Sequence, residues 1–129
     1  MEQSLQQEIV VGAAPERIYQ ALLDSARFSD FTGGAPATIA SEPGGAFSCF
    51  NGMITGRNVE LVPNRRIVQA WRAGNWPEGL YSIVRFELEP QGSETKLTLH
   101  HAAFPEGAAE HLAGGWHKMY WEPLKKYLG

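Results

Sequence analysis

The chain has 129 residues and a formal net charge of −3, and its 11 Lys and Arg residues are scattered rather than clustered. This length fits a single domain, 1–129, and the scattered basic residues exclude nucleic acid as the main partner, because neutralising phosphates takes a concentrated positive face. With one cysteine, no basic N-terminal leader and no apolar run near the roughly 20 residues that cross a bilayer, we expect a cytoplasmic protein with no disulfide and no membrane partner.

The N-terminal part predicts one strand followed by one or two short helices. The segment 4–13 is β-prone, and Pro15 then stands where the first turn of a helix accepts a proline. Apolar residues recur at helical spacing through 15–25. A second short helix is expected through Phe28 and Phe31, before the glycines that follow.

From residue 35 to 104 turn residues recur at the intervals typical of antiparallel strands. Pro63 and Asn64 predict one hairpin turn, and 90–94 predicts another. The alternation predicts that these residues share one face within their own strands: Phe47, Cys49, Asn51 and Met53; Val84, Phe86 and Leu88; Leu97, Leu99 and His101.

The segment 105–129 predicts a long C-terminal helix with one apolar stripe. An interior glycine costs up to roughly 1 kcal/mol and an interior proline about 3 kcal/mol against alanine. Gly114, Gly115 and Pro123 therefore predict a helix that either is kinked near 119–123 or begins only at Gly115. Trp116 and Trp121 are five positions apart, about 140° around an α-helix, so we do not expect both to be buried on one face. A long helix packed on a curved antiparallel sheet of six to seven strands is an α+β fold, with either a cavity or a filled core between the two layers.

The sequence contains no motif for catalysis, metal binding or a cofactor, and we predict none of the three. The histidines His100 and His101 point to opposite faces of a strand, while His111 and His117 lie apart on the helix. No phosphate-binding glycine loop or nucleophile motif is present. The carboxylates Glu78, Glu106, Glu110 and Glu122 are interpreted as solvated, and Cys49 as an inert buried thiol.

Two residues allow two interpretations each. His101 is either a core histidine bonded to its neighbours or a polar group facing a cavity. Trp76, in the stretch WRAGNWPEG at 71–79, is either core or a contact residue. Trp76, Glu78 and Trp121 are our candidates for an exposed patch that contacts a partner.

Several motifs in this order and spacing carry a family resemblance. They are Ala35-Pro36-Ala37, Gly44-Gly45-x-Phe47, Leu61-Val62-Pro63, Trp71-Arg72, Trp76-Pro77-Glu78-Gly79 and Gly115-Trp116. Over about residues 5 to 128 the chain resembles the activator of Hsp90 ATPase homologue family, in the domain that forms the C-terminal half of the eukaryotic co-chaperone. The resemblance implies the helix-grip fold of the START-like superfamily, with a cavity beneath the long helix.

For function, the resemblance implies a non-enzymatic binding protein, chaperone-associated or stress-related, with an Hsp90-type chaperone as partner. The co-chaperone's separate N-terminal domain has no counterpart in 1–129, so strong ATPase activation by this chain alone is not expected. The alternative is a carrier or sensor of a small hydrophobic ligand held between helix and sheet. Its cavity candidates are Phe47, Met53, Trp71, Phe86, Leu99, His101, Trp116 and Tyr120. A cyclase or hydratase activity, as elsewhere in the superfamily, is the third alternative, and no acid/base pair supports it.

Overall fold

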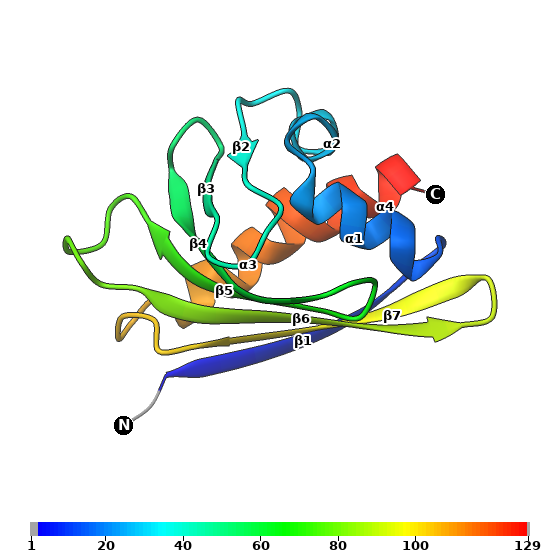
Figure 1. Cartoon of the computed structure of the whole chain (residues 1–129). Coiled ribbons are helices and arrows are strands. Elements are labelled where there is room, and N and C mark those ends of the chain that lie inside the picture. The colour runs from blue at the N-terminus through cyan, green and yellow to red at the C-terminus, as the bar shows by residue number, and fades with distance from the viewer. Residues whose placement is uncertain (1–2, 129) are drawn as a thin grey trace.

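The computed structural model describes residues 3–128 as an antiparallel sheet with helices on one side (Figure 1). In chain order the elements are β1 (Ser4–Val11), α1 (Pro15–Leu23), α2 (Ser25–Phe31), β2 (Thr38–Ile39), β3 (Ala46–Cys49), β4 (Ile54–Val62), β5 (Arg66–Ala73), β6 (Ser82–Gln91), β7 (Glu94–Ala102), α3 (Ala109–Gly115), the π-helix η1 (Trp116–Trp121) and α4 (Glu122–Leu128). Within the described residues seven strands form one sheet in the order β1-β7-β6-β5-β4-β3-β2. The predicted α+β architecture is confirmed.

The two predicted hairpins form where the turn residues placed them. Asn64 and Gly92 adopt positive φ angles of 63° and 65°, which tight turns between strands require. In the second hairpin Phe86 pairs with Leu99. This register puts the predicted apolar faces of β6 and β7 together against the helices.

The strand β3 ends earlier than the alternation predicted. Phe50 and Asn51 both take positive φ values, 54° and 56°, so the chain turns sharply after Cys49. The prediction that Asn51 and Met53 continue the face of Phe47 is therefore wrong. The turn directs Phe50 inward, where its ring lies 5.5 Å from that of Tyr120.

Gly56 occupies a position inside β4 at which a side chain would have no space. A Cβ at this position would clash with the backbone oxygen of Ala70 and would lie 2.7 Å from a ring carbon of Phe47. The missing side chain lets Phe47 pack directly on the backbone of the neighbouring strand.

The C-terminal helix begins at Ala109, so the alternative of a start at Gly115 is wrong. Its irregularity lies near the predicted kink, but in the form of a wider turn. The backbone N–H of Glu122 donates to the carbonyl of His117, five residues earlier, which is the π-helix pattern. This widening directly precedes Pro123, the residue that predicted a kink. Residues five apart in a π-helix lie roughly one above the other, so Trp116 and Trp121 share the buried face with exposed fractions of 2% and 1%.

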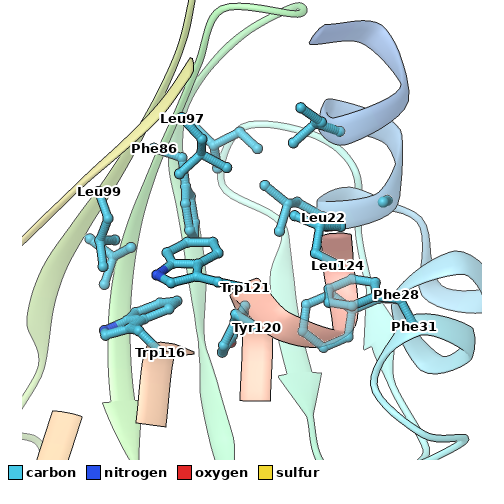
Figure 2. Close-up of a cluster of buried hydrophobic side chains, with 14 of the residues drawn as sticks. Leu22, Phe28, Phe31, Phe86, Leu97, Leu99, Trp116, Tyr120, Trp121 and Leu124 are labelled. Atoms are coloured by element: carbon cyan, nitrogen blue, oxygen red, sulfur yellow. The ribbon is translucent and has the colours of Figure 1, made fainter. Parts of the chain in front are cut away.

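Figure 2 shows the resulting core between helix and sheet. The indole rings of Trp116 and Trp121 stack with centroids 5.5 Å apart. Phe86 meets Trp116 edge-on at 5.7 Å from the sheet side. On the other side Phe28 of α2 contacts Tyr120 at 5.7 Å. The space beneath the middle of the long helix is thus filled with aromatic side chains.

Candidate binding cleft

A cleft of about 820 Å³ opens at the α3 end of the long helix. Its walls are the turn at 50–54, the end of β5 with the loop that follows it, the segment 105–108, and one face of α3 and η1. Because the core fills the space farther along the helix, the cleft is displaced to this end.

The floor and the rim of the cleft differ in exposure. The floor consists of rings that are almost fully buried, with exposed fractions of 4% for Trp71, 2% for Trp116 and 6% for Tyr120. At the rim Met53 is 68% exposed and Met119 is 42% exposed. The cleft is therefore an apolar, aromatic-floored depression with flexible thioether side chains at its edge.

Four of the eight predicted cavity residues line this cleft: Met53, Trp71, Trp116 and Tyr120. The other four, Phe47, Phe86, Leu99 and His101, belong to the closed core instead. The prediction placed them on the correct face of the sheet. It did not account for the indole rings that fill the space above them.

The segment 71–79 forms one wall of the cleft and is held by an arginine. The guanidinium Nη2 of Arg72 donates to the carbonyls of Trp76, at 2.7 Å, and Pro77, at 3.1 Å. The half-buried ring of Trp76 meets that of Trp71 at 5.6 Å and an interplanar angle of 61°. Trp76 is therefore both packed against the aromatic cluster and open to the cleft, while Glu78 is exposed beyond it.

Trp121 has no part in an exposed patch, and its assignment as a partner contact is corrected. Its indole N–H donates to Oε1 of Gln7 at 2.7 Å, and Nε2 of Gln7 donates to the carbonyl of Ala113 at 3.0 Å. The α-helical angle predicted exposure, whereas the π-helix turns this ring into the core.

His101 is a core histidine whose two ring nitrogens are both bonded. Trp116 Nε1–H donates to Nδ1 of His101 at 3.1 Å, and an indole nitrogen can only donate. The proton of His101 is therefore on Nε2, which lies 2.7 Å from the hydroxyl of Ser82. That hydroxyl donates in turn to the carbonyl of Trp71 at 3.0 Å. Burial lowers the pKa of His101 to about 4, so the ring is neutral near pH 7.

The other two buried titratable groups, Cys49 and Tyr120, are not activated as nucleophiles or bases. Burial raises the pKa of the Cys49 thiol to about 12, which keeps it protonated. Burial likewise raises the pKa of Tyr120 well above its usual value. Among residues 3–128, no three His, Cys, Asp or Glu side chains gather closely enough to hold a metal ion. The described helices include none that is long and apolar enough to span a membrane.

Sequence reasoning missed Phe50, Glu106, His111 and Met119 as residues that line the cleft. Phe50 was hidden by the early end of β3. Glu106 lies in a Pro-Glu-Gly turn like that at 77–79. This similarity between the two turns could have indicated Glu106 from the sequence. The polar members of this set, Glu106 and His111, are both exposed.

The seven-stranded antiparallel sheet and the long helix across one face define the helix-grip, START-like class of fold. The sequence model of the family described as "Activator of Hsp90 ATPase homolog 1-like protein" matches residues 12–129. The chain belongs to this family, as the resemblance predicted.

Two relatives and one solved structure show how far the similarity extends. Human activator of 90 kDa heat shock protein ATPase homolog 1 is 31% identical over 116 residues, which cover 90% of this chain and 34% of that protein. The mouse homolog 2 is 38% identical over 94 residues, covering 73% of this chain and 28% of that protein. The chain thus spans about a third of the length of the curated relatives it matches. The crystal structure of an HSP90 activator from Plasmodium falciparum superposes with a TM-score of 0.93 at 28% identity, covering 98% of this chain and 96% of that one.

Proposed function

We propose that this domain is a non-enzymatic, cytoplasmic binding protein that contacts an Hsp90-type chaperone. The observation that carries the proposal is its membership of a family named for activation of the Hsp90 ATPase, together with the TM-score of 0.93 to an HSP90 activator. The state of its buried titratable groups supports a non-enzymatic role. His101 is neutral and bonded on both nitrogens, and the raised pKa of Cys49 leaves no reactive thiolate.

The proposed contact surface is formed by Trp76, at the edge of the cleft, and by Glu78, which is exposed just beyond it. Trp76 is the half-buried tryptophan of the rim, and half-exposed aromatic anchors are typical of interface centres. Glu78 is exposed next to it and would add a charged contact. Arg72 fixes the loop through its two carbonyl contacts, so this surface is pre-organised before it binds.

Calorimetric titration of purified Hsp90 with this domain tests the proposal. Trp76→Ala is expected to weaken binding at least about tenfold, as removal of an interface anchor does. Glu78→Gln is expected to lower affinity mainly at low ionic strength. Ile83→Ala is the matched control, because this exposed apolar residue lies on the strand β6, with its side chain on the face away from the helices. Absence of binding by the wild-type domain would overturn the proposal.

A second function, carriage of a small apolar ligand, is favoured by the cleft itself. Its volume of about 820 Å³ lies within the roughly 300–1,000 Å³ of ligand pockets. Native mass spectrometry of the domain purified from its own host tests this. A bound mass that is lost on denaturation supports carriage, and a bare mass without co-purified ligand contradicts it.

A further inference from the structure

The charged side chains that line the cleft favour a bound cation over a bound anion. Among the described residues that line it, Glu106 is the only carboxylate and His111 the only imidazole, and neither lysine nor arginine is present. The other polar groups there are neutral: the amides of Asn51 and Asn75, the hydroxyl of Tyr120 and the indole N–H groups of the tryptophans. A bound anion would meet the carboxylate of Glu106 without a compensating cation, whereas a bound cation would be stabilised by it.

The aromatic rings add to this preference. Trp71 and Trp76 form a corner, with their planes at 61°, and the rings of Trp116 and Tyr120 lie beside it with centroids 4.3 Å apart. Ring faces carry negative electrostatic potential, and quaternary ammonium groups bind in sites built from several such rings. The floor of the cleft is therefore suited to a weakly hydrated organic cation.

The rim supplies the apolar part of a binding site. Met53 and Met119 are large, exposed and flexible, and thioether side chains adapt to alkyl chains of varied shape. A ligand that combines an alkyl chain with a cationic head would contact both features at once.

We propose that the cleft binds amphiphilic ammonium compounds, with the cationic head among the tryptophan rings near Glu106 and the alkyl chain along the methionines. The proposal rests on the second function above, carriage of a small ligand, and names the class of that ligand. The proposal can be tested whether or not the domain binds a chaperone.

The test compares three soluble amphiphiles that share one alkyl chain: octyltrimethylammonium, octanol and octanoate, each below its micellar concentration. Tryptophan fluorescence reports binding, since three of the lining residues are tryptophans. Octyltrimethylammonium is expected to bind about tenfold more tightly than octanol, in line with a desolvated cation–π contact, and octanoate more weakly than either. All three amphiphiles are compared in the same buffer of mildly alkaline pH.

Two variants assign the selectivity to this cleft. Glu106→Gln should bring the affinity for octyltrimethylammonium towards that for octanol and leave octanol binding unchanged. Glu110→Gln is the matched control, because Glu110 is exposed on the neighbouring helix α3 but does not line the cleft, and it should change neither affinity. Trp76→Phe should keep part of the preference for the cation, whereas Trp76→Leu should lose more of it.

The outcomes separate this proposal from the carrier function. Equal binding of all three amphiphiles, or a preference for octanoate, would overturn the cation selectivity and leave carriage of apolar ligands standing. Failure of all three to bind would overturn both. Sedimentation with phosphatidylcholine vesicles distinguishes a lipid headgroup from a soluble ammonium ligand. Binding to vesicles without binding of octyltrimethylammonium would contradict the proposal.

Discussion

Trp116 and Trp121 stack with their ring planes only 18° apart, although five residues separate them along one helix. An α-helix would direct them about 140° apart, and the π-helix η1 brings them onto one face. The wider turn thereby buries two indoles where a regular helix would bury one. The stacked pair fills the space between helix and sheet and confines the open cleft to one end of the helix.

Replacing Trp121 should destabilise the fold strongly. Trp121→Ala is expected to lower the free energy of unfolding by about 3–5 kcal/mol, the usual cost of a large aromatic cavity. Met119→Ala, an exposed position in the same π-helix, should change it by no more than about 0.5 kcal/mol. Urea unfolding measures both values, and near-ultraviolet circular dichroism should lose intensity with Trp121→Ala. Equal, small effects of the two substitutions would show that the stack is not part of the folded core.

His101 should make stability depend on pH on the acid side. Its pKa is lowered by burial from 6.5 to about 4, so the unfolded chain binds a proton first as the pH falls. The stabilisation is present in full above pH 6.5 and is lost as the pH falls towards 4. The loss amounts to about 3 kcal/mol. Protonation of Nδ1 would also break its bond from Trp116.

Urea unfolding across this pH range compares wild type with two variants. His101→Gln should be less stable near neutral pH but should show a flatter dependence on pH. His100→Gln is the matched control, because His100 lies on the more exposed face of the same strand. Burial and the charge of Arg85 lower the pKa of His100 as well. This variant should keep most of the wild-type slope. Identical slopes in wild type and His101→Gln would contradict the assignment.

Arg72 should hold the loop that carries Trp76. Arg72→Gln is expected to cost about 1.5–3 kcal/mol, as for hydrogen bonds donated by a charged group, because the carbonyls of Trp76 and Pro77 lose their donor. Arg85→Gln is the control, since its ion pair with Glu87 is exposed and worth at most about 1 kcal/mol. Thermal unfolding and a red shift of tryptophan emission test the difference. Loss of stability of the same size in both variants would contradict a special role for Arg72.

The Cys49 thiol should be unreactive in the folded protein. A pKa of about 12 leaves almost no thiolate at mildly alkaline pH, and the side chain is buried. Ellman's reagent should label no thiol in native protein and one thiol per chain in denaturant, because the sequence has one cysteine. Rapid labelling of the native protein would show that β3 opens on the timescale of the assay.

Much of this fold could be predicted because it follows from local patterns. Alternation in β6 and β7 placed Phe86 and Leu99 on the inward face, and Asn64 marked a turn. These features depend on residues that are close together in the sequence, so the sequence alone can predict them. The family resemblance depended on similar short-range motifs.

The candidate site was harder to predict because it depends on two backbone departures. Positive φ at Phe50 ended β3 early, and the π-helix rotated Trp121 inward. Both departures are selected by tertiary packing, since Phe50 contacts Tyr120 and Trp121 donates to Gln7. Regular periodicity therefore gave the correct face of the sheet for Phe47, Phe86 and Leu99 but the wrong face for Met53 and the wrong exposure for Trp121.

The contacts that β1 makes with the C-terminal part of the chain affect how the protein folds during its synthesis. Gln7 and Trp121 are 114 positions apart, and among the described strands β1 pairs with β7 alone. On the ribosome β1 emerges before β7 and stays without this partner until the segment between the two strands has followed. Contacts of such long sequence separation form slowly, and exposed strand edges aggregate in the meantime. A domain from a family of chaperone activators thus has a nascent chain of the kind that chaperones protect.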